Sequence, residues 1–323
     1  MLFKVNHNNS LNKSFSYRAF GLNWNSSDLE IPELPQLEDN KDNFDINISE
    51  DNNDRWPTLK KGEYDTSFLK IAHNDLRLTI KDIASFRVID GKNIFWKKSK
   101  PFVDLQDIRT FLLGSPFGAI LIQREFLVFH GNALVKDGSA VIFLGDSGSG
   151  KSTIAYGLMR AGWKLIADDL VVLNDQGFVL PGVRRIKLWE DAMNAFDLDI
   201  SKFQPCRKNL NKYLIMGDDI EEELFPAKLK SIYILGCKKE IETFTNDLII
   251  PITSQKQKIL MLRNNIFRPR FVRALGKEGL NFIAIAKFIN KMPVYLIPNI
   301  IGIKKMQKFL STINLLDFEL VDH

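Results

Sequence analysis

Residues 145–152 read GDSGSGKS, which fits the pattern G-x-x-x-x-G-K-[ST]. The run SAVIFL before it is typical of a buried strand, and STIAYGLMRAG after it is typical of a helix. In this context the pattern predicts a phosphate-binding loop, because its glycines let backbone N–H groups curl around phosphate oxygens. The start of the helix adds the positive end of its dipole. The stretch therefore predicts an α/β domain that binds a nucleotide.

The loop residues divide into backbone and side-chain roles. We expect the Lys151 ammonium to reach the β- and γ-phosphates and the Ser152 hydroxyl to hold Mg²⁺. A chance Gly/Ser-rich loop before a helix is the alternative. The expected nucleotide-binding residues are Gly145, Asp146, Ser147, Gly148, Ser149, Gly150, Lys151, Ser152 and Thr153.

A pair of aspartates, Asp168 and Asp169, stands inside the apolar run LIADDLVVL at 165–173. Burying one carboxylate is costly, and burying two adjacent ones is worse. Mg²⁺, a lysine or a substrate hydroxyl close by would offset this cost. The alternative is a solvated turn at the end of a strand.

Chain lengths indicate where this pair lies. A helix over 152–161 covers about 15 Å, and a strand over 163–167 covers roughly 16 Å on its return. If that strand lies beside the strand at 140–144, a βαβ crossover brings both strand ends to one edge of the sheet. Both carboxylates would then be level with the phosphate loop.

Hairpin register adds a histidine to the same edge. The Asp-Gly pair at 137–138 predicts a two-residue turn. Pairing outward from this turn places Gly131 opposite Leu144, and His130 opposite Gly145. We expect a functional role for His130, although a lone histidine is often structural.

The 323 residues suffice for one large or two ordinary domains. Alternation in DLRLTIKD and an Asp-Gly turn at 90–91 predict a β-rich N-terminal domain over 1–105. A catalytic domain over 106–323 follows, opening with helices across 104–123. The acidic, Asn-rich stretch 38–55 is expected to be a loop. We further predict strands at 132–136, 140–144, 163–167, 170–173, 230–235 and 293–297, and helices at 152–161, 278–290 and 302–314.

Charge and composition narrow the class of protein. Ten acidic residues and one lysine between Asp28 and Asp54 leave the rest of the chain near +14, since the net charge is +5. No RNP strand or helix-turn-helix pattern accompanies this excess, so we expect no nucleic-acid partner. No apolar run is long enough to span a membrane, and no secretory signal opens the chain. Cys206 and Cys237 are expected to be separate buried thiols in a cytoplasmic protein.

Three segments together resemble the catalytic domain of bacterial HPr serine kinase/phosphorylase: HG at 130–131 before a hairpin, GDSGSGKST, and GWKLIADD at 162–169. The resemblance is strong over 125–175 and looser over 176–323. It implies the superfold shared with phosphoenolpyruvate carboxykinase, in which the phosphate loop lies in a mixed sheet. It also implies catalytic roles for residues that match the family motif, namely His130, Lys151, Asp168 and Asp169.

The same resemblance implies that one aspartate accepts a proton from the substrate hydroxyl and that the other helps Ser152 to hold Mg²⁺. The residues alone leave the two assignments open, and the usual assignment in HPr kinases favours Asp169 as the base and Asp168 as the metal ligand. The segment LPGVRRIKLWEDAMNAF at 180–196 lacks the Glu-Ile-Arg-Gly-type signature of HPr kinases. It looks instead like divergent members of the group, including lasso-peptide kinases, as do FSYRAFGLNWNSSDLEIPEL at 15–34 and MPVYLIP at 292–298.

We therefore expect an ATP- and Mg²⁺-dependent kinase acting on a serine-type hydroxyl of a peptide or protein. A kinase for free serine or a sugar is one alternative, and a nucleotide-binding sensor or scaffold without phosphoryl transfer is another. The basic segment 254–277 favours a peptide, although it could be a solvated face. The candidate contacts to substrate or phosphate are Arg184, Arg185, Arg268 and Arg270. Homo-oligomerisation is left open.

Overall fold

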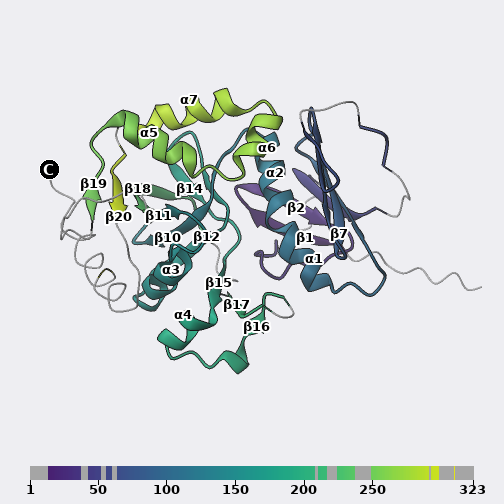
Figure 1. Ribbon diagram of the computed structural model, residues 1–323, viewed down its shortest axis with the longest axis horizontal. Helices are drawn as coiled ribbons and strands as arrows, with labels where there is room; N and C mark the ends of the chain where they lie inside the picture. The colour runs from purple at the N-terminus through teal and green to yellow at the C-terminus, as the bar shows by residue number, and fades with distance from the viewer. Residues whose placement is uncertain are drawn as a thin grey trace, which may run out of the picture.

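The computed structural model describes residues 14–37, 43–51, 56–59, 64–207, 210–216, 224–236, 249–290, 292–297 and 309. In this part of the chain, two large sheets flank a central layer of two helices, and a small three-stranded lobe projects from one side (Figure 1). The fold is therefore mixed α/β, as predicted. No described helix has the length and apolar character needed to cross a membrane.

The N-terminal sheet has eight strands in the order β1-β2-β3-β8-β7-β6-β5-β4. Its inward-facing residues alternate with half-exposed ones, which is the pattern of a sheet with one buried face. The predicted turn joins β7 to β8, with positive φ at Asp90 and Gly91. The strands are β1 (Phe15–Ala19), β2 (Leu22–Ser26), β3 (Ile46–Glu50), β4 (Tyr64–Asp65), β5 (Leu69–Ala72), β6 (Asp75–Ile80), β7 (Ala84–Ile89) and β8 (Asn93–Lys98).

The expectation of a loop throughout 38–55 is wrong. Strand β3 lies within that stretch and pairs in parallel with both β2 and β8. Ile46 and Ile48 are fully buried, so two apolar side chains with a spacing of two are enough to place the strand inside the sheet. The surrounding acidic and asparagine residues hide this alternation in the sequence.

Helices α1 (Leu105–Leu112) and α2 (Ser115–Gln123) form the central layer. Pro116 lies in the first turn of α2, and all residues from Pro116 to Gln123 are buried. Phe117 stacks on Trp24 of β2 with ring centroids 4.3 Å apart. A helix that is apolar on every side needs packing partners all round, and α2 finds them in both sheets.

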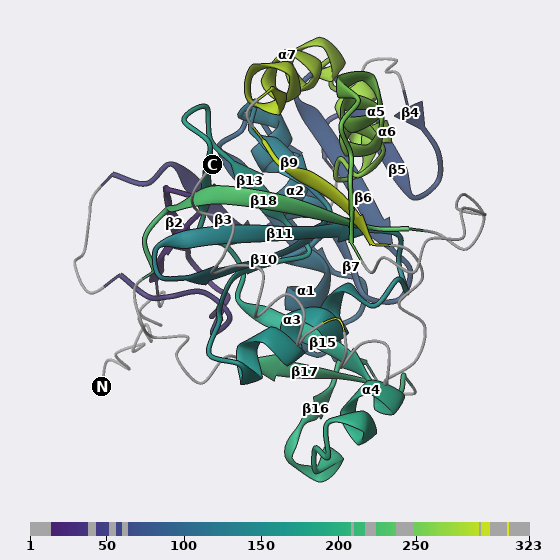
Figure 2. The ribbon, with the colours of Figure 1, turned by 90° about the vertical axis from the view of Figure 1, so that its left-hand side faces the viewer.

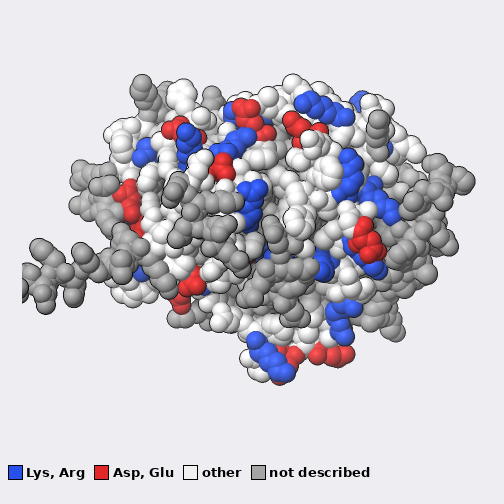
Figure 3. Space-filling model, turned by 180° about the vertical axis from the view of Figure 1, so that it is seen from behind, with Lys and Arg blue, Asp and Glu red and all other residues white. Residues whose placement is uncertain are grey.

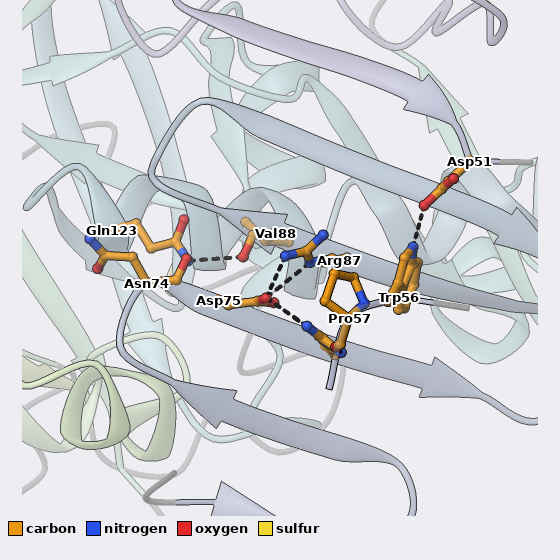
Figure 4. A network of polar contacts seen from close by, with 9 residues as sticks. Asp51, Trp56, Pro57, Asn74, Asp75, Arg87, Val88 and Gln123 are labelled. Atoms are coloured by element: carbon orange, nitrogen blue, oxygen red, sulfur yellow. Dashed lines mark hydrogen bonds and ion pairs between the residues drawn. The ribbon is translucent and has the colours of Figure 1, made fainter. Parts of the chain in front are cut away.

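Gln123 fixes the end of α2 to two turns of the N-terminal sheet (Figure 4). Its Nε2 donates to Asn74 O at 2.9 Å and to Val88 O at 3.1 Å, and its Oε1 accepts from the Gly91 backbone at 2.9 Å. Three hydrogen bonds therefore satisfy this buried amide.

Close to the hydrogen bonds of Gln123, Asp75 of β6 pairs with Arg77 and Arg87, each at 2.8 Å (Figure 4). Burial alone would raise the pKa of Asp75, but hydrogen bonds from the two guanidinium groups outweigh it and hold that pKa below its usual value. Trp56 donates its indole N–H to Asp51 at the edge of the same network.

The second sheet has nine strands, seven of them in the order β12-β10-β11-β18-β14-β13-β9, with β20 beside β18 and β19 beside β20. Strands β11, β18 and β20 run parallel and the other pairings are antiparallel, so the sheet is mixed. All six predicted strands lie here. The strands are β9 (Leu127–Phe129), β10 (Gly131–Lys136), β11 (Ser139–Gly145), β12 (Lys164–Asp168), β13 (Val171–Leu173), β14 (Phe178–Leu180), β18 (Ala227–Leu235), β19 (Ile250–Pro251) and β20 (Val294–Ile297).

Helices cover both faces of the second sheet. Helix α3 lies on one side, and α5, α6 and α7 lie on the other (Figure 2). These helices are α3 (Lys151–Arg160), α5 (Gln255–Asn264), α6 (Pro269–Ala274) and α7 (Glu278–Ile289). The helices predicted at 152–161 and 278–290 are confirmed, whereas the one predicted at 302–314 lies, except for Phe309, outside the described residues.

The projecting lobe is a sheet of order β15-β17-β16. Ile186, Leu188 and Ile215 of this sheet share an apolar cluster with Ile154 and Leu158 of α3, so the lobe is fixed to the helix that follows the phosphate loop. Its elements are β15 (Arg185–Trp189), α4 (Glu190–Ala195), the 3₁₀ helix η1 (Ile200–Lys202), β16 (Gln204–Pro205) and β17 (Lys212–Met216).

Candidate active site

The phosphate loop connects the end of β11 to the start of α3, as predicted. Gly145, Gly148 and Gly150 have φ values of 139°, 82° and 96°, which side chains rarely permit. A Cβ on Gly145 would lie 2.8 Å from the Leu235 carbonyl oxygen of β18. Glycine is therefore required both for the loop's path and for its contact with the neighbouring strand.

Two side chains of the loop have polar groups suited to phosphate. Lys151 is buried, and its Nζ donates to Gly145 O at 2.6 Å and Asp146 O at 2.9 Å. Burial lowers the pKa of Lys151, while Asp169 and Asp168 act in the opposite direction. Ser149 Oγ is buried and makes no hydrogen bond within the described part of the chain. A phosphate oxygen would satisfy it.

The aspartate pair lies at the level of the loop, but by a different route from the one expected. Strand β12 does not lie beside β11, because β10 occupies the place between them. Asn132 of β10 faces Asp168 on one side and Phe143 of β11 on the other. The crossover from β11 to β12 therefore passes over one intervening strand, β10. The ends of β11 and β12 still lie at the same edge of the sheet, so both carboxylates are level with the phosphate loop.

Asp168 ends β12 as a buried residue. Its Oδ1 accepts a hydrogen bond from Asn132 Nδ2 at 2.5 Å. Burial, and then the charge of Asp169, raise the pKa of Asp168 well above its usual range. A further positive charge close to Asp168 would therefore favour its ionised form.

Asp169 occupies a strained turn between β12 and β13. Its φ is 62°, and the turn closes with a hydrogen bond from the Leu170 backbone to Asp168 O at 2.7 Å. Its Oδ2 pairs with Lys187 Nζ at 2.5 Å, and the side chain is 36% exposed. Burial opposes ionisation, but the Lys187 charge and hydrogen bond hold the pKa of Asp169 below its usual range. Two adjacent carboxylates thus differ in protonation behaviour.

His130 lies where the hairpin register predicted. Gly131 pairs with Leu144, and His130 is the next residue beyond this pair. Its backbone N–H donates to Asn265 O at 2.9 Å, and its Nδ1 is 3.3 Å from Asp169 O. Burial, followed by the charge of Lys151, lowers the pKa of His130. Its neutral ring can support the Asp169 turn through Nδ1–H.

The structure places the four candidate arginines differently. Arg268 is the N-cap of α6 with φ of 46°; burial lowers its pKa, and its charge acts on both Asp169 and His130. As whole residues, Arg268 and Arg270 are both exposed, and Arg270 lies over the ring of Phe271, 5.9 Å from the centroid. Arg268 is the one of this pair whose charge acts on Asp169.

Arg184 and Arg185 are both buried at the start of the lobe. Arg185 pairs with Glu33 at 3.0 Å and donates to Thr110 O at 3.4 Å, so its guanidinium binds protein groups. The positive charge of Arg185 nevertheless favours the ionised forms of both Asp168 and Asp169, although burial outweighs this effect at Asp168.

Sequence reasoning missed Lys187 and Asn132. Lys187 lies two residues after Arg185, on the same face of a strand that was not predicted. The sequence predicts a strand that includes Asn132 but no contact with Asp168, because that contact depends on β12 lying beside β10.

The donor set fits Mg²⁺. Within the described ranges, no group of three or more His, Cys, Asp or Glu side chains could hold a metal ion by itself. Mg²⁺ commonly uses one or two carboxylates together with substrate phosphates. Asp168, whose burial opposes its ionisation more strongly than the nearby cations favour it, and the hydroxyl of Ser152 in the first turn of α3 are the groups available.

Comparisons with known proteins give short local matches, and no family model matches the chain. The chain is 42% identical over 53 residues to the HPr kinase/phosphorylase of Prosthecochloris aestuarii (strain DSM 271 / SK 413), covering 16% of each protein. It is 43% identical over 66 residues to the HPr kinase/phosphorylase of Chlorobium phaeobacteroides (strain BS1), covering 18% of this chain and 20% of that protein. The matched segments thus span a fifth or less of these relatives.

A solved structure of the Hpr(Ser) kinase/phosphatase from Coxiella burnetii aligns with 60% of this chain and 92% of its own, at 14% identity and a TM-score of 0.29. A TM-score this low does not establish a shared arrangement. The local sequence matches show that part of this chain is similar to HPr kinase/phosphorylase.

Proposed function

We propose that this protein is an ATP- and Mg²⁺-dependent kinase that transfers the γ-phosphoryl group to a serine-type hydroxyl of a peptide or protein. One observation carries the proposal: the phosphate loop, Lys151 and the aspartate pair meet at one edge of a sheet, at the height that register sets. Phosphoryl transfer needs these parts, since positioning and charge neutralisation supply most of the acceleration.

The roles follow from the surroundings of each group. The loop backbone and Lys151 would bind the phosphates of ATP, and Ser152 and Asp168 would hold Mg²⁺. When bound, Mg²⁺ neutralises charge on the phosphate oxygens. Asp169, the more exposed carboxylate, would accept the proton of the acceptor hydroxyl. Arg268 would contact the transferred phosphate.

A peptide or protein acceptor is supported by the surroundings of the site. The basic segment 254–277 forms α5 and α6, and the charge of its Arg268 acts on Asp169. The proteins with local sequence matches are named as kinases of HPr. A free amino acid or sugar would need no extended basic surface.

The test is mass spectrometry of candidate peptides after incubation with ATP and Mg²⁺. We expect a gain of one phosphate in the wild type and a loss of at least 100-fold in rate for Asp169→Asn. Asp175→Asn, in an exposed turn, is the matched control. If Asp169→Asn reacts as fast as the control, Asp169 is not the base.

A second candidate function is a nucleotide sensor without phosphoryl transfer. The ion pair with Lys187 favours it, because a carboxylate with a lowered pKa is a weaker base. ATP binding without turnover, unchanged by loss of either aspartate, would support the sensor and exclude the kinase.

A further inference from the structure

Strand β15 has two chemically different faces. Ile186 and Leu188 pack in the apolar cluster shared with α3. Arg185 and Lys187 alternate with them and lie on the opposite face. One face of this short strand therefore carries two cationic side chains, and the opposite face packs in the apolar cluster.

The first cation is fixed to the N-terminal part of the chain. Arg185 pairs with Glu33 at 3.0 Å, and their side chains are only 3% and 5% exposed. Arg109 of α1 lies 3.4 Å from the other Glu33 oxygen. A carboxylate from the segment between β2 and β3 thus holds the beginning of β15 against α1.

The second cation reaches the candidate active site. Lys187 Nζ lies 2.5 Å from Asp169 Oδ2, and its side chain is 19% exposed. The chain entering β15 also bonds to β12 through Gly182 N–Ile166 O and Asp168 N–Val183 O, both 2.9 Å. The spacing between β15 and the aspartate turn is therefore fixed by backbone as well as side-chain contacts.

We propose that Lys187 is a positioning residue that holds the Asp169 carboxylate in one orientation, and that the Glu33–Arg185 pair holds Lys187 in place. The N-terminal part of the chain is thereby a component of the active site. For its effect on rate, the inference rests on the proposed role of Asp169 as proton acceptor. Its effect on the turn does not depend on that role.

The experiment uses full-length Lys187→Met and Lys187→Arg, with Lys202→Met as control. Lys202 belongs to the same lobe, is 74% exposed and lies 3.8 Å from Asp199. Hydrogen–deuterium exchange of a peptide covering 165–173 reports on the turn without requiring activity. Steady-state kinetics with ATP and an acceptor peptide that the wild type phosphorylates separates kcat from KM.

We expect Lys187→Met to raise exchange at 165–173 at least tenfold and to lower kcat about 100-fold, with KM for ATP within twofold. Lys187→Arg should restore most of the protection from exchange and most of kcat, and Lys202→Met should match the wild type in both. Unchanged exchange in Lys187→Met would overturn the inference, whatever the activity. If Lys187→Met raises exchange but the wild type transfers no phosphate to any peptide, the positioning role of Lys187 stands and the proposed kinase activity is rejected.

Discussion

At the scale of single residues, the site depends on two neighbouring carboxylates that are driven in opposite directions. Asp168 lies buried beside Asn132, and its pKa is raised, while Asp169 faces Lys187, and its pKa is lowered. Paired acids whose environments separate their pKa values are typical of sites with two distinct tasks. The strain at Asp169 and the buried charge at Asp168 both reduce stability, which sites often accept for function.

The first prediction concerns Asp168→Asn. Since burial opposes the charge of Asp168 more strongly than the nearby cations favour it, the amide should stabilise the ligand-free protein by about 1 kcal/mol. The same change should weaken Mg²⁺-dependent ATP binding at least tenfold. Thermal unfolding and calorimetric titration, with and without Mg²⁺, measure the two effects. A fall in stability without ligand would show that the carboxylate is already compensated.

The second prediction concerns Asp75 and pH. Its pKa is lowered on folding, so the ionised form stabilises the protein above about pH 4, and this contribution is lost as pH falls further. Asp75→Asn should therefore be less stable than the wild type at pH 7, and the difference should shrink on acidification. Urea unfolding between pH 3 and 7 tests this. A constant difference would contradict it.

At the scale of elements, β15 connects three parts of the molecule, and its buried ion pair is the most sensitive link. Removing one member of a buried pair leaves the other charge uncompensated, whereas removing both is better tolerated.

The third prediction follows from this asymmetry. Arg185→Met should cost about 3 kcal/mol of unfolding free energy, and Glu33→Met a similar amount. The double variant should lose less than the two single losses combined. Denaturant unfolding of the wild type, the two single variants and the double variant gives the coupling free energy between Glu33 and Arg185. Strict additivity would mean that the pair contributes nothing as a pair.

Sequence reasoning succeeded where the physical signal is local. The Asp-Gly turn at 137–138 sets the register that places His130, and the glycine pattern predicts the phosphate loop. It failed where the outcome depends on distant partners. The helix between β11 and β12 does not determine whether another strand lies between them, and Lys187 gains its role only from how β15 packs.

At the scale of the whole molecule, the two large sheets share one continuous core. One apolar cluster includes residues of both sheets, from Tyr17 of β1 to Leu296 of β20, with α2 between the sheets. A second cluster joins the other face of the second sheet to α3 and the lobe. Phe20 N donates to Pro181 O, so the N-terminal sheet also contacts the segment leading to β15. On the face seen in Figure 3, basic and acidic side chains of the described residues are interspersed. The division into domains at residue 105 stays a prediction.

The fourth prediction tests that division. A chain of residues 106–323 would expose the face of α2 that carries Phe117, so we expect it to aggregate or to lack a cooperative unfolding transition. The full chain should unfold in a single transition. Calorimetry and near-UV circular dichroism distinguish the outcomes. A soluble, cooperatively folded 106–323 would establish an independent domain.

Gly118 in the middle of α2 has a consequence that reaches beyond the core. A Cβ there would overlap the Phe267 ring, and Phe267 directly precedes Arg268, whose charge acts on Asp169. By helix preference alone, alanine should be the better residue at this position. In this protein the opposite holds: one added methyl group would displace the ring and move the neighbouring guanidinium. A substitution that looks harmless in a list of variants would thus disturb the candidate active site from a position outside it.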